Sequence, residues 1–513
     1  MNWLEITHYI YMTIYTITLA IVCIYGFHRY SLVYLYFKHR KNKPVAPDEF
    51  KDLPRVTIQL PMFNERFVAD RIIRRTCEMD YPKDKLQIQV LDDSTDDTEQ
   101  IAQKAVDEMK AKGFDITLIH RIDRTGYKAG ALENGMKTAT GEFISIFDAD
   151  FMPRKDFLMR TVHHFTDPKV CVVQSRWEHI NKNDSLLTKT QAILLDGHFG
   201  VEHIGRNRSG RFMQFNGTGG TWRREAIADA GGWCHDTLTE DLDLSYRAQM
   251  KGWKFVFLPD LVSPAELPPH ISGFKAQQFR WTKGGAQNTL KLLPTLMKSN
   301  MPFKVKLEGF FHLTGFCVHI FMLALILMML PAMLWESILV ESGTVWRILV
   351  DMSIFVLATM SATVFYCTGQ HVINRTWHYP LKYFPMLLAI AVGLSVSNTK
   401  AVLEALLRKK SGFVRTPKFG EDDSAVQSQK YIDKLEKKKI NWLPWIEIVF
   451  GLYMAACTVI SLINIDEKSL TAAFLAIFTF GFFYVAILTF TQGTKKAKAT
   501  DAEPALAEVT IND

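Results

Sequence analysis

The sequence predicts an α/β domain with a mostly parallel sheet, joined to a set of transmembrane helices. The first observation is the distribution of charge: residues 309–335, 448–465 and 469–494 contain no Lys, Arg, Asp or Glu, whereas residues 38–307 are rich in them. Each uncharged segment is close to or above the roughly 20 residues that a membrane helix needs. The second observation is that strand-like and helix-like patterns alternate in the charged region, which is typical of a parallel sheet with crossover helices.

The expected elements of the sheet follow one another from residue 56 onwards. Runs of β-branched and apolar residues predict strands at residues 56–61, 86–91, 114–120 and 143–147. The stretches between and after them predict helices at residues 65–79, 97–112 and 128–138. Ligands bind to such sheets beyond the carboxyl ends of the strands, so the residues that follow the strands are the first candidates for a functional site.

Paired carboxylates follow two of the predicted strands. Asp92 and Asp93 come after the second strand, and Asp148 and Asp150 after the fourth. Carboxylates gathered at one edge need a cation, and oxygen ligands alone select a hard divalent ion, Mg²⁺ or Mn²⁺. The alternative is that an Asp after a strand only caps the next helix, which we favour for residues 96–97. We interpret Asp148 and Asp150 as metal ligands.

Five segments are expected to cross the membrane, at residues 6–26, 309–335, 345–370, 448–465 and 469–494. The first has no basic region before it and is interpreted as a retained anchor rather than a cleaved signal peptide. Because basic residues stay on the cytoplasmic side, the basic run at residues 38–43 places the charged region in the cytoplasm. Residues 381–407 are interpreted as an amphipathic helix in the membrane interface, with a sixth span as the alternative.

Composition excludes two classes of function. The net charge is +7, and no Lys/Arg run is interleaved with aromatic residues, so a nucleic-acid partner is not expected. The seven cysteines are scattered without a CxxC pair. This pattern argues against a disulfide framework or a zinc site and fits a reducing compartment for the charged region.

Six motifs stand in a fixed order along the charged region: LPMFNE at residues 60–65, VLDDSTD at 90–96, GYKAGAL at 126–132, DAD at 148–150, TED at 239–241 and QQFRW at 277–281. As a set they resemble those of a processive family 2 glycosyltransferase. Within that family the chain resembles the cellulose-synthase-like group, and most of all the mannan synthase and xyloglucan-backbone glucan synthase types. The resemblance is dense over residues 54–290 and implies the GT-A fold for the α/β domain.

The resemblance implies a nucleotide-sugar donor, UDP-glucose or GDP-mannose, with Mg²⁺ or Mn²⁺ as cofactor and inversion at the anomeric carbon. It places the donor on Asn64, Glu65, Asp92, Asp93, Lys128, Asp148, Gln277 and Arg280. Asp148 and Asp150 are the implied metal ligands, and Trp281, Phe215 and Asn216 the implied acceptor contacts. For Trp281 an aromatic residue of the membrane interface is the alternative.

Inversion by a single displacement needs one general base for the acceptor hydroxyl, and Asp241, beside Glu240 in the TED motif, is our candidate. Residues 239–243 also look like the start of a helix. The two interpretations are compatible, because a residue at a helix N-terminus is well fixed.

A further motif lies far downstream. FVRTPK at residues 413–418 resembles the gating loop of the family, and this resemblance implies that Thr416 and Lys418 contact the diphosphate and that the loop excludes water. Two positions depart from the family pattern: Arg415 stands where the family has Val, and Asn216 stands where processive members often have Cys.

The expected organisation has eight parts: an anchor at residues 1–37, the GT-A domain at 50–270, interface helices at 271–305, two spans within 306–370, the interfacial helix at 381–407, the gating loop and linker at 408–440, two spans within 442–494, and a disordered tail at 495–513. The expected location is a plasma or inner membrane, or a Golgi membrane in a eukaryote, with the catalytic domain cytoplasmic.

The expected function is polymerisation of a hexose into a β-linked polysaccharide that is passed across the membrane. Its partners would be the nucleotide sugar, the growing β-glycan and membrane lipids, and the sequence leaves an accessory export subunit open. The alternative is a non-processive lipid glucosyltransferase of the ceramide type, which shares the Asp and QxxRW pattern. A transporter or scaffold with an inactive domain is disfavoured by the complete set of carboxylates.

Overall fold

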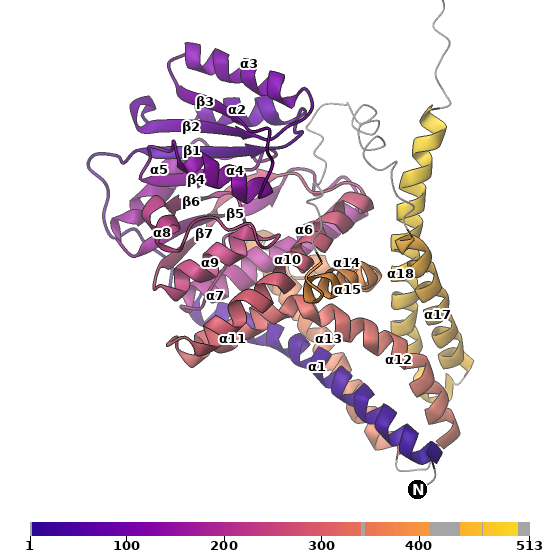
Figure 1. The fold of residues 1–513 in the computed structure, drawn as a ribbon. Helices are drawn as coiled ribbons and strands as arrows, with labels where there is room; N and C mark the ends of the chain where they lie inside the picture. The colour runs from indigo at the N-terminus through magenta and orange to yellow at the C-terminus, as the bar shows by residue number, and fades with distance from the viewer. Residues whose placement is uncertain (1–2, 340–343, 375, 410–441, 464, 501–513) are drawn as a thin grey trace, which may run out of the picture.

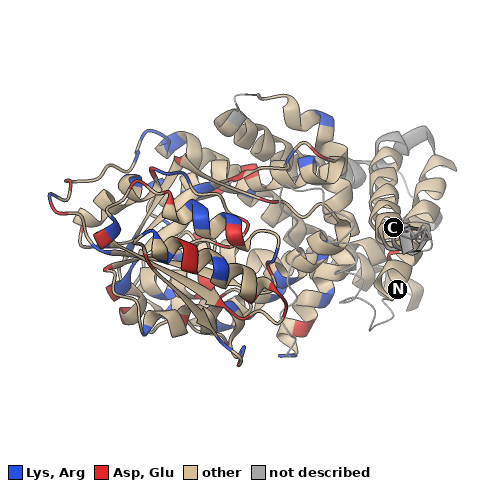
Figure 2. Cartoon of the chain, turned by 90° about the horizontal axis from the view of Figure 1, so that it is seen from above, with Lys and Arg blue, Asp and Glu red and all other residues tan. Residues whose placement is uncertain are grey.

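The computed structural model describes residues 3–339, 344–374, 376–409, 442–463 and 465–500. An α/β domain lies at one end of the molecule, and long helices extend from it at the other (Figure 1). Lys, Arg, Asp and Glu residues are spread along the ribbon of the α/β domain and are sparse on the described parts of the long helices (Figure 2). The division into a charged domain and apolar helices therefore matches the prediction from the sequence.

The α/β domain is built on a seven-stranded sheet in the order β3-β2-β1-β4-β6-β5-β7. Strand β6 is antiparallel to β4 and β5, and the other described pairings are parallel. This confirms the predicted fold class, and β1 to β4 coincide with the four predicted strands. The bounds are β1 Val56–Met62, β2 Leu86–Asp92, β3 Asp115–His120, β4 Phe143–Ile146, β5 Val170–His179, β6 Gly220–Arg223 and β7 Lys254–Ala265.

Helices lie on both faces of the sheet, and the central strands between them are almost wholly buried, as is usual for parallel strands. The predicted helices correspond to α2, α3 and α4, and every end lies within four residues of its predicted position. The helices and helical turns of the domain are α2 Ala69–Cys77, η1 Lys83–Lys85, α3 Thr98–Ala111, α4 Tyr127–Met136, α5 Phe157–Val162, η2 His163–Thr166, α6 Leu186–Gly197, the π-helix η3 His198–His203, α7 Ile204–Arg208, α8 Arg224–Asp229 and α9 Glu240–Met250.

Helix α4, which carries the GYKAGAL motif, is fixed to the sheet by buried glutamines. The amide nitrogen of Gln59 on β1 donates to the Gln89 side-chain oxygen on β2 (3.0 Å), and the Gln89 amide nitrogen donates to the carbonyl of Gly135 (3.0 Å). A Cβ at Gly135 would lie 2.6 Å from the Gln59 amide nitrogen. The small residue thus lets the helix approach the strands, and this packing sets the position of Lys128 at the other end of α4.

The rest of the described chain is helical: α1 Trp3–His39, α10 Ile271–Lys298, α11 Phe303–Thr314, the helical turn η4 Gly315–Cys317, α12 Val318–Leu339, α13 Thr344–Asn374, α14 Tyr379–Gly393, α15 Ser395–Leu406, α17 Leu443–Ile463 and α18 Ile465–Thr500. Within the described residues, four segments are long and apolar enough to cross a membrane: Trp3–His39, Phe303–Leu334, Leu443–Ile463 and Ala472–Gln492. The expected span at residues 345–370 lies within α13, which packs against α1.

The ambiguous segment at residues 381–407 forms two helices, α14 and α15, which meet at an angle of 41°. Taken together as one broken span they would make a fifth crossing. Helix α14 packs against α18, and α15 packs against α10 and α12. The number of spans and the orientation of the chain in the membrane stay predictions.

Candidate active site

The α/β domain and α10 enclose a cavity of about 160 Å³ at the carboxyl edge of the parallel strands. Its wall includes the segments that follow β1 and β4, the start of α4, the start of α9 and one side of α10. Most of the predicted site residues that the structure describes line it, namely Glu65, Asp93, Lys128, Asp148, Asp150, Asn216, Glu240, Asp241, Gln277, Arg280 and Trp281. Motifs far apart in the sequence therefore meet in one place.

Asp93 is held on the predicted donor side of the cavity by a two-pronged ion pair. The Nε and Nη2 atoms of Arg121 donate to its two carboxylate oxygens at 2.7 and 2.6 Å. Arg124 also lines the cavity, with its guanidinium 3.2 Å from the ring centroid of Phe63. Sequence reasoning missed Arg124, although its place just before the GYKAGAL motif is a signal that could have found it.

Asn64 and Asp92, also expected to bind the donor, lie behind the cavity wall. Asn64 has a left-handed backbone (φ 57°), and its backbone N–H donates to the hydroxyl of Ser94 at 2.8 Å. Asp92 is fully buried and accepts from the Ser94 hydroxyl (2.5 Å), while its other oxygen lies 2.7 Å from Nδ1 of His120. In this structure the two residues brace the loops that carry Glu65 and Asp93.

Asp148 and Asp150, the predicted metal ligands, both line the cavity. One oxygen of Asp150 accepts from the backbone N–H of Glu266 (3.3 Å), and Asp148 accepts from the Lys128 ammonium (2.5 Å). Two carboxylates on one wall form a donor set that fits Mg²⁺ or Mn²⁺. The lysine beside Asp148 provides positive charge at the same point, where a diphosphate would also be neutralised.

Another group of possible metal ligands lies elsewhere, where Cys234, Asp236 and Asp243 place one atom each within 4.8 Å of one another. Lys291 contacts both carboxylates of this group, at 2.7 Å and 2.9 Å, and Arg247 also contacts Asp243. Asp148 and Asp150 line a cavity that has room for a ligand, whereas none of Cys234, Asp236 and Asp243 lines it, so the cavity is the better candidate for an ion.

Lys128 lies near both the candidate metal ligand Asp148 and the predicted catalytic carboxylates Glu240 and Asp241. Burial opposes its charge, but Asp148, Glu240 and Asp241 outweigh this effect and raise the pKa of Lys128. Its ammonium also donates to the carbonyl of Gly217 (3.0 Å). Lys128 is therefore a fixed cation in the cavity and is suited to contact a phosphate group.

Asp241 lies in the first turn of α9, as the sequence predicted, and accepts from the backbone N–H of Leu242 (2.8 Å). Burial, reinforced by the charge of Glu240, raises the pKa of Asp241 to about 7, against the opposing effects of the Leu242 hydrogen bond, Lys128 and Arg280. A carboxylate whose pKa lies near neutrality is well suited to act as a general base.

Helix α10 presents Gln277, Arg280 and Trp281 to the cavity between two buried ion pairs. Lys275 contacts Glu447 of α17 (2.6 Å), and Lys283 contacts Glu404 of α15 (2.8 Å). Both lysines are buried. These pairs fix the position of α10 relative to the membrane helices, and with it the three side chains of the QxxRW motif.

The predicted acceptor loop is only partly in the cavity. Asn216 lines it, but Phe215 is fully buried and packs edge-to-face on Trp222 (ring centroids 5.5 Å apart). Gly217 has a positive φ of 79°, and a Cβ there would lie 3.0 Å from the Asp241 carboxylate. Phe215 therefore anchors the loop in the core, whereas Asn216 and Gly217 face the site.

Trp177 is a cavity residue that the sequence did not reveal. It lies on β5, packs edge-to-face on Phe151 (5.4 Å), and its indole N–H is 3.4 Å from the carbonyl of Thr218. Strand β5 was not among the predicted strands, so no sequence signal pointed to it. The gating-loop residues Thr416 and Lys418 lie outside the described residues.

Comparison with known proteins agrees with this site. A family model described as "Glycosyltransferase like family 2" matches residues 54–284. The chain is 34% identical over 445 residues to glucomannan 4-beta-mannosyltransferase 2 of Arabidopsis thaliana, an alignment that covers 82% of this chain and 79% of that protein. It is 44% identical over 255 residues to probable glucomannan 4-beta-mannosyltransferase 7 of Oryza sativa subsp. japonica, which covers 48% of this chain and 44% of the rice protein.

Among solved structures, the mannosyltransferase PcManGT from Pyrobaculum calidifontis, in complex with GDP-Man and Mn²⁺, is similar with a TM-score of 0.50. It is 20% identical, and the match covers 77% of this chain and 100% of that chain. This likeness supports the fold. The chain belongs to the family 2 glycosyltransferases, in their cellulose-synthase-like group, and is a hexosyltransferase.

Proposed function

We propose that the protein transfers mannose from GDP-mannose to the end of a growing β-linked glycan. The observation that carries the proposal is one cavity in which Asp241, with its raised pKa, lies beside Lys128, Arg280 and Trp281. The choice of mannose over glucose is supported by the relatives, which bear the name glucomannan 4-beta-mannosyltransferase. Their name also supports a β-1,4 linkage.

In the proposed reaction Asp241 removes the proton from the acceptor hydroxyl as that oxygen attacks the anomeric carbon. One displacement inverts the configuration and gives the β-linkage. Lys128 and Arg280 stabilise the charge that develops on the leaving nucleoside diphosphate. A divalent ion held by Asp148 and Asp150 would supply further neutralisation of the diphosphate. Glu240 acts on Asp241, because its charge helps to raise the pKa of the base.

The acceptor in this proposal lies on Trp281, with Asn216 beside it. An aromatic face packs well against the C–H face of a pyranose, and the indole ring lines the same cavity as Asp241. Asp93 and Glu65 contact the nucleoside, supported by Asn64 and Asp92 behind them. Gln277 contacts the leaving group from α10.

The helices support a further part of the proposal, that the product crosses the membrane. Helix α10, which carries the acceptor platform, is joined by buried ion pairs to α15 and α17. A chain that leaves Trp281 would therefore enter between helices whose positions are fixed relative to the site. We place the catalytic domain on the cytoplasmic side of a plasma or Golgi membrane, where Thr416 and Lys418 would close over the donor.

The donor assignment is tested by measuring nucleotide release from GDP-mannose and from UDP-glucose with the purified protein, in Mn²⁺ and in Mg²⁺. We expect a kcat/KM at least about tenfold higher for GDP-mannose. Preference for UDP-glucose would reject mannose as the donor sugar. A product with a single sugar on a lipid would reject the polymerase in favour of a ceramide-type enzyme.

A further inference from the structure

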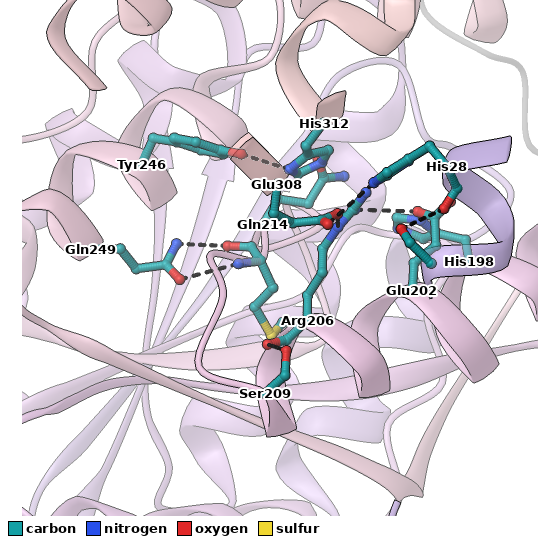
Figure 3. A network of polar contacts seen from close by, with 12 residues as sticks. His28, His198, Glu202, Arg206, Ser209, Gln214, Tyr246, Gln249, Glu308 and His312 are labelled. Atoms are coloured by element: carbon teal, nitrogen blue, oxygen red, sulfur yellow. Dashed lines mark hydrogen bonds and ion pairs between the residues drawn. The ribbon is translucent and has the colours of Figure 1, made fainter. Parts of the chain in front are cut away.

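A continuous set of polar side chains joins η3 and α7 to helices α1 and α11 (Figure 3). It consists of His198 and Glu202 on η3, Arg206 on α7, Glu308 on α11 and His28 on α1. We call these five residues the His–Glu network. None of them was singled out by the sequence, because their positions are spread from residue 28 to residue 308 and no common motif joins them.

The network reaches the cavity through a hydrogen bond between His198 and Asn216, the predicted acceptor-loop residue that lines the cavity. The Asn216 side-chain oxygen lies 2.5 Å from Nε2 of His203, and its amide nitrogen lies 3.0 Å from Nε2 of His198. The backbone N–H of Asn216 donates to the side-chain oxygen of Gln174 (3.2 Å). One rotamer of Asn216 satisfies both histidine contacts, so the two histidines fix which way its amide faces.

These contacts assign the proton of each histidine. His203 donates from Nε2 to the asparagine oxygen, and burial lowers its pKa well below the usual value, so it is neutral. His198 accepts the asparagine N–H at Nε2, and its Nδ1–H must therefore donate to Glu202, which lies 2.8 Å away. A carboxylate on one ring nitrogen of a histidine fixes the tautomer and the orientation of the ring.

Glu202 is in turn held by the buried Arg206. Although burial opposes ionisation, Arg206 and His198 hold the pKa of Glu202 well below its usual value. The Arg206 guanidinium lies 3.3 Å from Glu202 and donates from Nε to Glu308 (3.0 Å), and the other oxygen of Glu308 lies 3.2 Å from Nε2 of His28. Because both carboxylates share one guanidinium, an unbroken series of polar contacts joins α1 and α11 to His198.

A second connection joins the same helix α11 to the catalytic helix. His312 lies 3.2 Å from the side-chain oxygen of Gln214, two residues before Asn216, and its Nδ1 lies 2.8 Å from the hydroxyl of Tyr246 on α9 (Figure 3). Asp241 stands at the start of α9. Helix α11 therefore contacts both the segment leading into the acceptor loop and the helix of the proposed base.

We propose that the His–Glu network positions the Asn216 side chain for the acceptor sugar and fixes its position relative to Asp241. His198 and Glu202 are positioning residues in this account, and the inference rests on the proposed function of the cavity. The Asn216 amide presents its remaining hydrogen-bonding capacity to an acceptor hydroxyl. The predicted donor contact Asp93 is held by Arg121, which is not part of the network, so the network should affect the acceptor far more than the donor.

The test is steady-state kinetics of His198→Phe with a soluble β-mannooligosaccharide as acceptor. The phenyl ring fills the site but cannot accept the Asn216 N–H, so we expect the acceptor KM to rise roughly tenfold while the donor KM stays within about twofold. His198→Gln can place an amide oxygen near the position of Nε2. It should restore the acceptor KM to within about threefold of the original protein.

His164→Phe is the matched control, because His164 is a buried histidine on η2 (His163–Thr166) outside the network. Its acceptor and donor KM values should not change. An unchanged acceptor KM in His198→Phe would overturn the inference, and so would an equal rise in both KM values, since that would report a general loss of structure. If the original protein transfers no sugar at all, the proposed function fails instead.

Discussion

At the scale of single residues, the chemistry depends on how the cavity changes the ordinary properties of Asp241 and Lys128. Both groups are charged or chargeable side chains removed from water, and each is balanced by its neighbours. Burial favours the neutral form of Asp241, whereas three carboxylates favour the charged form of Lys128. The same pocket thus holds the proposed base, whose pKa is raised to about 7, and a lysine whose pKa is also raised.

Asp241→Asn removes the proposed base without changing its size. We expect kcat to fall roughly 10²–10⁴-fold while the donor KM changes little, because the amide cannot accept the proton. The check is transfer of radiolabelled mannose, with donor binding measured by calorimetry on the same preparation. Transfer at the original rate would rule out Asp241 as the base.

The raised pKa of Asp241 also predicts how activity and stability depend on pH. The base is active when deprotonated, so kcat/KM should rise as the pH passes through about 7. The folded state binds this proton more tightly than the unfolded state, whose reference value is 3.8. As the pH rises from about 4 to about 7, the folded state therefore loses stability, compared with a protein that has a non-titrating side chain at this position.

Asp241→Asn should accordingly raise the Tm at pH 8 and have no such effect below about pH 4. The measurement is a thermal melt of both proteins in detergent across this pH range. A Tm gain that is the same at every pH would contradict the assigned pKa.

At the scale of elements, helix α10 and the loop after Phe215 bring the site together. Lys283 and Glu404 form a buried pair between α10 and α15. Lys283→Met leaves the carboxylate of Glu404 without its main partner, so we expect the free energy of unfolding to fall by about 3–5 kcal/mol. The double variant Lys283→Met with Glu404→Leu should recover most of this loss, because the pair then leaves no buried charge behind. Equal Tm values for the single and double variants would argue against the pair.

Gly217 lies two residues after Phe215 and lines the cavity beside Asp241. Its φ is 79°, and a Cβ added there would lie 3.0 Å from the Asp241 carboxylate, so Gly217→Ala strains the loop and displaces the base. We expect about 1–2 kcal/mol of lost stability together with a lower kcat. Gly113→Ala is the control, since it shares the positive φ (84°) but its added Cβ would meet no heavy atom of the described residues within 4 Å. An equal kcat in both variants would contradict the role of the loop.

Much of the site could be predicted from the sequence because catalytic groups of this kind stand in short local motifs. Asp148, Asp150, Asp241 and the QxxRW residues all reached the cavity as expected. Phe215 did not, since a motif shows which segment approaches the site but not which side chain turns into the core. Arg124 joined the site without having been predicted.

The fold divides in the same way. Strands β1 to β4 alternate with helices along the sequence, which made them predictable. Strand β6 has only four residues and is antiparallel, and it was not predicted. The His–Glu network joins residues far apart in the chain, such as His28 and Glu308, and only the packed structure brings them together.

At the scale of the whole molecule, the charged α/β domain lies beside the apolar helices, and α10 lies between the domain and these helices. Asp148 and Asp150 place two carboxylates in the cavity where the diphosphate of the donor would bind. We therefore expect donor binding to depend on a divalent ion. Removing the ion with EDTA should lower transfer roughly 100-fold or more, and Mn²⁺ or Mg²⁺ should restore it. Full activity in EDTA, measured on thoroughly dialysed protein, would mean that Lys128 and Arg280 suffice for the diphosphate.

The most direct test of the central claim is analysis of the product that the purified protein makes from GDP-mannose in Mn²⁺. We expect a polymer of mannose joined by β-1,4 linkages, formed by the original protein and absent with Asp241→Asn. Linkage analysis and size-exclusion chromatography measure both properties. An α-linked product, a product with only one added sugar, or an undiminished polymer from Asp241→Asn would contradict it.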